Sequence, residues 1–270
     1  MSWYSNTQKS DSVVKIHLNP LDNIPTEVHE GALVTLSNAL NQFNRENKRK
    51  KFAFETSEDA VTWTVFNYLN QKRFLSESLK LSSLDWLIQK DIEPTILLWG
   101  VPVPGAERRG IDIKKNLIMI LNKIGEDPQK YSEPDVILDF EDIGVVLIEV
   151  KYRSRNDTLN EKSPKWEKYV HNSIAFADIA GVKKTGYYEL ARNWRIAWDL
   201  SGERSMALIN LGPESIFKNN AGKKISEFSK CLRQNKTCKF VDTTWKRLFG
   251  ATSDHPQWFD KYLKERSLLA

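Results

Sequence analysis

Two apolar segments separated by a short polar link constrain the fold of this sequence more than any other feature. Residues 135–140 read DVILDF, and residues 145–152 read VVLIEVKY. β-Branched and other apolar residues favour extended strands, and a link of four residues that ends in glycine favours a hairpin. We therefore predict two adjacent antiparallel strands joined by residues 141–144.

The two predicted strands carry charged residues at positions that fall on one face. Side chains of a strand alternate between two faces, so Glu149 and Lys151 project from the same side. A turn centred on Asp142 places Asp135 opposite Glu149, and a register shifted by two residues places Asp135 opposite Lys151. In either register the two carboxylates and the ammonium group share one face of the hairpin.

This arrangement suggests metal chemistry. Two carboxylates inside an apolar sheet repel each other, but Mg²⁺ removes that penalty because it binds carboxylate oxygens, water and phosphate oxygens. A lysine beside a metal-bound water can orient or deprotonate it during phosphodiester hydrolysis. We therefore predict Asp135 and Glu149 as metal ligands, Lys151 as a catalytic group, and Mg²⁺ as the cofactor, with Mn²⁺ able to substitute. The alternative is a structural ion pair between Glu149 and Lys151 on an ordinary sheet.

The remaining segments alternate between helical and extended patterns. The spacing of apolar residues predicts helices over 27–44, from Thr56 or Ser57 onward, and over 112–124, 186–200, 243–249 and 256–267. Apolar runs predict further strands over 95–101, 205–211 and near 239–241. The basic run 45–51 (RENKRKK) is expected to link the first two helices. This alternation is typical of the α/β class.

Pro134-Asp135, a spacer, and Glu149-Val150-Lys151 together resemble the motif of the PD-(D/E)XK nuclease superfamily, which has the restriction-endonuclease-like fold. The resemblance implies a mixed β-sheet flanked by helices, in the order helix, strand, strand, strand, helix, strand. It would cover residues 52–212, with a helical and basic extension over 1–51. Residues 213–270 would form a mostly helical extension packed on the core.

The same resemblance implies a Mg²⁺-dependent endonuclease that acts on DNA rather than RNA, in restriction, mobile-element defence, repair or recombination. It also implies an acidic metal ligand from the first core helix, where Glu58 is the match and Glu55 and Asp59 are local competitors. The alternative for Glu58 is simple stabilisation of a helix N-terminus.

Four further residues are predicted to contact nucleic acid. Arg153 and Arg155 follow Lys151 on the same face if the strand continues, and the alternative is two solvated loop arginines. Tyr188 and Arg192 lie one helical turn apart, where they can approach the site or the substrate backbone or form a plain surface pair. The net charge of +5 is compatible with nucleic-acid binding.

Composition excludes some classes of protein. Hydrophobic residues make up 40% and charged residues 28%, which is ordinary for a globular protein, and no apolar run is long enough to span a membrane. With Cys231 and Cys238 as reduced thiols and no secretory signal, we expect a soluble cytoplasmic protein. Trp63, Trp194 and Trp198 are expected to pack in the core.

The sequence leaves several alternatives open. A homodimer and partner subunits of a larger nuclease system are both compatible with it. The chain could instead bind nucleic acid or partner subunits through a nuclease fold without cutting, or it could act on RNA. A third alternative is an unrelated α/β interaction protein whose hairpin charges are structural.

Overall fold

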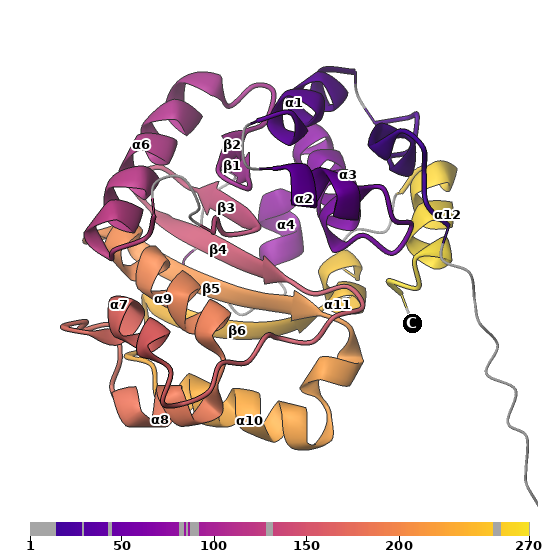
Figure 1. Ribbon diagram of the computed structural model, residues 1–270. Coiled ribbons are helices and arrows are strands. Elements are labelled where there is room, and N and C mark those ends of the chain that lie inside the picture. The colour runs from indigo at the N-terminus through magenta and orange to yellow at the C-terminus, as the bar shows by residue number, and fades with distance from the viewer. Residues whose placement is uncertain are drawn as a thin grey trace, which may run out of the picture.

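The computed structural model describes residues 15–28, 30–42, 45–80, 84, 86, 92–127, 132–250 and 255–269. Within these ranges, eleven α-helices flank a mixed, six-stranded β-sheet (Figure 1). The predicted α/β class and the mixed sheet flanked by helices are therefore confirmed. Among the described helices, none has both the length and the apolar character needed to cross a membrane.

The sheet has the strand order β2-β1-β3-β4-β5-β6. Its strands are β1 (Thr95–Leu98), β2 (Val101–Pro102), β3 (Val136–Asp139), β4 (Gly144–Val150), β5 (Ser205–Gly212) and β6 (Cys238–Thr244). The first four strands pair antiparallel, whereas β5 and β6 run parallel to β4. Since β6 lies in 213–270, this C-terminal segment supplies a strand of the same sheet as well as helices.

The predicted hairpin forms in the first of the two predicted registers. Val136 pairs with Ile148, and Asp139 pairs with Val145. Extended by one residue, this register places Asp135 opposite Glu149.

The predicted strand over 95–101 is wrong in one respect, because the chain folds back at Trp99 and Gly100. Both residues have positive φ angles, 50° and 67°, as in the two-residue turns that match the twist of a hairpin. Leu98 then pairs with Val101, and β2 forms one edge of the sheet. Pro102 is tolerated there because an edge strand does not need every backbone N–H for the ladder.

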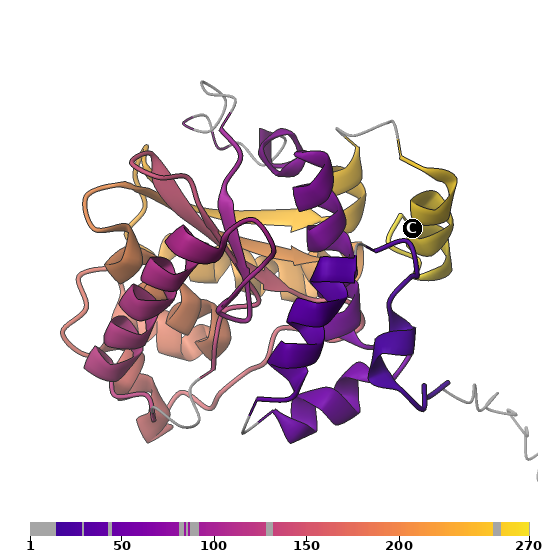
Figure 2. The ribbon, with the colours of Figure 1, turned by 90° about the horizontal axis from the view of Figure 1, so that it is seen from above.

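Each face of the sheet is covered by its own set of helices, and Figure 2 shows the two sets on opposite sides. One core contains residues of α1 (Glu30–Leu40), α2 (Glu46–Phe52), α3 (Glu58–Lys72), α4 (Leu75–Lys80), α11 (Trp245–Phe249) and α12 (Gln257–Glu265). The other contains residues of α6 (Glu107–Lys123), α7 (Glu167–Val170), α8 (Ile179–Thr185), α9 (Tyr188–Ser201) and α10 (Asn219–Lys230). We call the two sides the α3 face and the α9 face.

Buried aromatic residues contribute to both cores. Trp63 is buried on the α3 face and Trp194 on the α9 face, as predicted, and the half-buried Trp198 packs against Trp194. Cys231 and Cys238 are free thiols, also as predicted.

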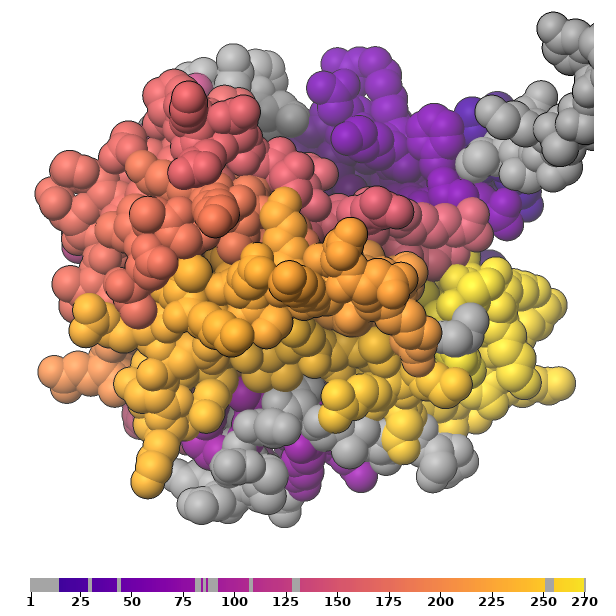
Figure 3. Space-filling view, turned by 90° about the horizontal axis from the view of Figure 1, so that it is seen from below, coloured from indigo at the N-terminus to yellow at the C-terminus, as the bar shows by residue number. Residues whose placement is uncertain are grey.

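Seen from below, the segment that contains α10 and β6 crosses the middle of the molecule (Figure 3).

The basic run 45–51 is not a linker, which corrects the prediction. Most of it forms α2, because glutamate, lysine and arginine favour helices and Glu46 pairs with Lys50 one turn later at 2.7 Å. The helix predicted over 27–44 spans only Glu30–Leu40, and residues 29 and 43–44 lie outside the described part. The helices α7, α8 and α10 were not predicted. Residues 1–14 of the predicted N-terminal extension also lie outside the described ranges.

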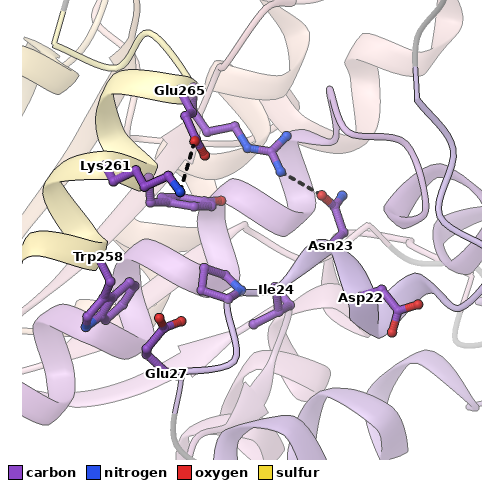
Figure 4. A pocket seen from close by; sticks show the side chains of 10 residues that line it. Asp22, Asn23, Ile24, Glu27, Trp258, Lys261 and Glu265 are labelled. Atoms are coloured by element: carbon purple, nitrogen blue, oxygen red, sulfur yellow. Dashed lines mark hydrogen bonds and ion pairs between the residues drawn. The ribbon is translucent and has the colours of Figure 1, made fainter.

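The N-terminal and C-terminal segments meet beside a pocket whose lining includes Asn23, Trp258 and Lys261 (Figure 4). Asn23 is buried, and its amide donates hydrogen bonds to two backbone carbonyl groups at the end of α2. Its side-chain oxygen accepts a hydrogen bond from Arg266 at 2.7 Å. This contact ties the segment before α1 to the end of α12.

Candidate functional site

The four predicted catalytic residues converge at the carboxyl end of β4. Lys151 follows β4, and its Nζ lies 2.6 Å from Glu149 Oε1 and 3.8 Å from Glu58 Oε1. Asp135 precedes β3, and its Oδ2 accepts a hydrogen bond from the backbone N–H of Val150 at 2.8 Å. Residues from α3, β3 and β4 therefore meet in one cluster, which we call the carboxylate–lysine cluster.

Glu149 is the most enclosed carboxylate of the cluster. Its Oε1 accepts a hydrogen bond from Lys151, and its Oε2 accepts one from the amide of buried Asn193 on α9 at 2.6 Å. Burial alone would raise the pKa of Glu149, but the positive charges of Lys151 and Arg192 outweigh burial and lower it. Glu149 is therefore held as a carboxylate.

Lys151 lies among three carboxylates. Besides Glu149 and Glu58, Nζ contacts Glu189 Oε2 of α9 at 3.3 Å. Burial would lower the pKa of Lys151, but the surrounding carboxylates, led by Glu149, raise it above its ordinary value. In this arrangement Lys151 is a fixed positive charge rather than a base.

The backbone of Lys151 is fixed as well. Its N–H donates to the carbonyl oxygen of Leu211 at 2.7 Å, and its carbonyl oxygen accepts a hydrogen bond from the indole of Trp245 at 2.9 Å. The end of β5 approaches closely, since a Cβ added at Gly212 would lie 2.5 Å from Ile216 and 3.2 Å from the Cβ of Lys151. Glycine at this position therefore lets β5 pack against the cluster.

Asp135 is the carboxyl group of the cluster whose charged form is most disfavoured. Burial is the largest cause that raises its pKa well above the ordinary value, the negative charge of Glu149 raises it further, and Lys151 opposes both. The predicted repulsion between the two carboxylates agrees with this direction, because such repulsion favours a proton on one of them.

Glu58 begins α3 directly after the N-cap Ser57, whose hydroxyl accepts a hydrogen bond from the N–H of Ala60. Its Oε2 accepts hydrogen bonds from the backbone N–H of Tyr152 and the hydroxyl of Ser154, both at 2.7 Å. Burial raises the pKa of Glu58, and Lys151 opposes this. The side chain is thus both at a helix N-terminus and in the cluster.

The two local competitors of Glu58 lie elsewhere. Asp59 forms an ion pair with Lys48 of α2 at 3.0 Å. Glu55 is exposed, and its backbone N–H donates to the carbonyl oxygen of Lys15. The positions of these side chains favour Glu58 as the acidic residue from α3.

The residues predicted to contact nucleic acid fall into two groups. Arg153 and Arg155 are exposed on the segment that follows β4, and Arg153 lies over the ring of Tyr152 at 5.2 Å. Arg192 is buried, and its Nε donates to Asn193 Oδ1 at 3.2 Å. Tyr188 is half-buried. This placement favours a supporting role for Arg192 beneath Glu149 rather than a contact with a substrate backbone.

Sequence reasoning missed the role of Asn193. Its amide joins Arg192 to Glu149, so it orients the carboxylate that the motif identifies. Its spacing of four residues from Glu189 puts both on one side of α9. This spacing was the one hint in the sequence that Asn193 accompanies Glu189. Only the packing of α9 against β4 directs the Asn193 side chain toward Glu149.

The donor set of the cluster suits a hard divalent cation in chemical type and in charge. Four carboxylates (Asp135, Glu149, Glu58 and Glu189) are accompanied by the cations Lys151 and Arg192. Within the described ranges, however, no three His, Cys, Asp or Glu side chains are arranged to hold a metal ion together. The ammonium group of Lys151 lies between three of the carboxylates, so a metal bound to them requires its displacement.

The fold and the site define an α/β protein with a buried carboxylate–lysine cluster at the carboxyl end of its parallel strands. Comparisons with protein-family models, with curated proteins and with solved structures found no match. Inferences about function therefore depend on the residues and contacts described above.

We expect Asp135→Asn to stabilise the metal-free protein at about pH 8. The folded-state pKa of Asp135 is raised, so its contribution to stability is present below the unfolded-state pKa and is lost as pH rises through the folded-state pKa. Asparagine stays neutral, so the gain in the free energy of unfolding should shrink toward about pH 4. Thermal unfolding in the presence of a chelator would measure this gain as a rise in the melting temperature. Each 1 kcal/mol of stability corresponds to a rise of about 2–4 °C.

The matched control is Asp112→Asn, which removes an exposed carboxylate on α6. It should change the melting temperature little at either pH. A variant Asp135→Asn that is less stable than the unmodified protein at about pH 8 would contradict the electrostatic strain assigned to Asp135.

Proposed function

We propose that this protein is a divalent-metal-dependent endonuclease that hydrolyses phosphodiester bonds, most readily in DNA. The observation that carries the proposal is the convergence of Asp135, Glu149, Lys151 and Glu58 from three separate elements. The resemblance to the PD-(D/E)XK motif supports it. The order of α3, β1, the hairpin of β3 and β4, α9 and β5 along the chain also supports it, although further elements, including β2 and α6, lie between them. We further propose the restriction-endonuclease-like fold for the core and a cytoplasmic location.

In this proposal Asp135, Glu149 and Glu58 hold Mg²⁺, and Mn²⁺ can replace it. A bound divalent cation supplies Lewis acidity and lowers the pKa of a coordinated water. Asn193 keeps one oxygen of Glu149 oriented, and the Tyr152 N–H and Ser154 hydroxyl do the same for Glu58. Such outer contacts fix the direction of metal ligands.

Lys151 contributes a permanent positive charge. When a cation occupies the cluster, the ammonium group can keep its contact with Glu189 while it leaves Glu149. From there it can offset the negative charge that develops on the phosphoryl oxygens during hydrolysis. Its raised pKa favours this electrostatic role over removal of a proton from water.

The substrate backbone is proposed to approach over the exposed segment after β4. Arg153 and Arg155 carry positive charge there, and contacts with phosphate groups provide affinity without sequence information. The preference for DNA over RNA is part of the proposal. Restriction, mobile-element defence, repair and recombination are the processes in which such an activity would serve, alone or with partner subunits.

Cleavage of supercoiled plasmid tests the proposal. We expect nicking with Mg²⁺ or Mn²⁺ and none with a chelator. Glu149→Gln should reduce the rate by at least about 100-fold, because the loss of an outer-shell partner alone costs about 10–100-fold. Glu203→Gln, which removes an exposed carboxylate after α9, is the matched control and should cut normally.

The results separate the alternatives. Equal cleavage by the unmodified protein and Glu149→Gln would show that a contaminant cuts the plasmid. Binding of DNA without any cleavage would favour a binding protein, and faster cleavage of a matched RNA would favour an RNA-directed nuclease.

A further inference from the structure

The helix α2 carries a concentration of positive charge that the proposed nuclease site does not use. In the run 45–51, five of the seven residues are basic and one is acidic. Residues 49–51 are exposed, and Lys48 is half-buried. The helix packs against α3, which begins with Glu58 of the carboxylate–lysine cluster (Figure 1). The positive charge of α2 therefore lies beside the cluster.

The inner side of α2 is seated on Trp99. Arg45 is buried, and its Nη2 donates hydrogen bonds to the carbonyl oxygen of Trp99 at 3.0 Å and to Glu133 Oε1 at 2.5 Å. Phe52 packs edge-on against the Trp99 ring, with the ring centroids 6.0 Å apart. The backbone N–H of Trp99 in turn donates to the carbonyl oxygen of Asp135 at 3.1 Å. These contacts hold α2 in place next to the strand end that carries Asp135.

Lys48 has a fixed position between α2 and α3. Its Nζ lies 4.0 Å from the centroid of the Trp99 ring, which is a cation–π contact, and 3.0 Å from Asp59 Oδ1. Asp59 directly follows Glu58, so Lys48 contacts the chain neighbour of a proposed metal ligand. Burial raises the pKa of Asp135, and the positive charge of Lys48 is among the influences that oppose it. Lys48 thus adds positive charge at the edge of the cluster.

Lys48 and Lys51 form a pair of ammonium groups that can bind a further ligand. An ammonium group has three N–H donors, and the hydrogen bond of Lys48 to Asp59 uses one of them. The Lys48 side chain is 27% exposed. Lys51 lies three residues later, where helix geometry places it beside Lys48, and it is exposed. Lys50 and Arg49 instead contact a glutamate of α2 and the asparagine that follows α1.

Positive charge also reaches Glu58 from a second element. Glu58 Oε2 accepts a hydrogen bond from the hydroxyl of Ser154, and the exposed Arg153 and Arg155 flank this serine. The first turn of α3 therefore contacts one basic segment through Glu58 and another, α2, through Asp59. Basic side chains spread over two elements complement a backbone with many phosphate groups better than one small anion.

We propose that Lys48 and Lys51 bind the phosphate backbone of a DNA duplex, on the other side of the scissile phosphate from Arg153 and Arg155. The inference rests on the proposed nuclease function and extends its substrate-binding surface to α2. The contacts with Trp99 and Asp59 hold Lys48 in position before the duplex arrives. Binding to such a preorganised side chain costs less conformational entropy than binding to a freely moving lysine.

The salt dependence of DNA binding tests this inference without measuring activity. Fluorescence anisotropy of a labelled duplex, titrated with the full chain at several salt concentrations, gives the association constant, and a chelator prevents cleavage. The logarithm of this constant falls with the logarithm of the salt concentration, by a slope of about 0.9 for each neutralised phosphate. We expect Lys51→Gln to reduce the slope by about 0.9, and Lys48→Gln with Lys51→Gln to reduce it by about 1.8.

The matched control is Lys236→Gln. Lys236 is exposed in the turn before β6, at the end of the parallel strands away from the cluster, so its replacement removes the same charge and should leave the slope unchanged. Thermal unfolding establishes that each variant is folded. Lys51→Gln alone decides the test if Lys48→Gln unfolds through the loss of its contacts with Asp59 and Trp99.

The outcomes distinguish this inference from the proposed function. Salt slopes that stay unchanged in folded Lys51→Gln, or that fall equally in Lys236→Gln, would overturn the role of α2 and leave the nuclease proposal standing. A lower slope in Lys51→Gln alone, with no plasmid cleavage by the unmodified protein, would support the DNA-binding surface and contradict the nuclease proposal. If the unmodified protein binds no duplex even at low salt, the inference fails, and plasmid cleavage alone then decides the nuclease proposal.

Discussion

Replacement of Lys151 by methionine is expected to destabilise the metal-free protein by about 3–5 kcal/mol near pH 7, as is typical when one partner of a buried ion pair is removed. The ammonium group contacts Glu149, Glu189 and Glu58 at 2.6, 3.3 and 3.8 Å. Methionine preserves much of the side-chain volume but leaves these carboxylates to repel one another. Unfolding in urea, with a chelator present, would measure the loss.

A double variant makes this prediction specific to charge. Glu149→Gln removes the nearest carboxylate, so Lys151→Met combined with Glu149→Gln should be more stable than Lys151→Met alone. Such a difference measures the coupling between two contacting residues, and we expect at least about 1 kcal/mol. Mn²⁺ should also restore part of the stability of Lys151→Met, because a divalent cation can neutralise the same carboxylates.

The control for Lys151→Met is Lys115→Met on α6, where the side chain is exposed. Surface substitutions of this kind usually change stability by less than about 0.5 kcal/mol. If both methionine variants unfold at the same urea concentration, the three contacts of Lys151 contribute nothing to folding, and the electrostatic description of the cluster is wrong.

A second large effect is expected at Asp139, at the opposite end of β3 from the cluster. Its buried carboxylate accepts hydrogen bonds from Arg109 Nη2 at 2.5 Å, from Arg204 Nη1 at 2.9 Å and from the N–H of Glu141 at 2.9 Å. Asp139→Asn removes the charge that both guanidinium groups share. We expect a loss of about 2–4 kcal/mol, less than for a wholly buried network because both arginines reach water.

The second prediction also separates stability from function. Asp139→Asn should leave the affinity for Mn²⁺ unchanged where the protein is folded, since Asp139 is not part of the cluster. Asp142→Asn, in the exposed turn of the same hairpin, is the matched control. Equal midpoints of urea unfolding for the two variants would contradict a structural role for the ion pairs of Asp139.

The hairpin followed from local sequence, because apolar residues and a short polar link specify it. Its register was narrowed to two alternatives that keep the same side chains on one face, and the strand pairing of the structure decides between them. The fold-back at Trp99 and Gly100 did not, since hydrophobic residues continue on both sides of the turn. The helix α2 was missed because a charged run resembles a linker until its buried end, Phe52, is placed in a core.

The residues that surround the motif could not be predicted from local sequence patterns, for a different reason. Asn210 and Asp242 lie beside Glu149 in the sheet only through the pairing of the parallel strands β4, β5 and β6, which are far apart in the sequence. Asn193 reaches Glu149 only because α9 is rotated so that one of its polar positions faces β4. Such contacts depend on tertiary structure, so the sequence identified the motif but not its supporting residues.

The carboxylates around Lys151 come from both helical layers. Glu58 begins α3 on one side of the sheet, and Glu189 lies in the first turn of α9 on the other. One ammonium group thus bridges two halves of the molecule that otherwise bury separate apolar surfaces. Any sliding of either layer along the sheet changes the distances between this nitrogen atom and its carboxylates, so the electrostatic environment of Lys151 should report how closely the two halves are held together.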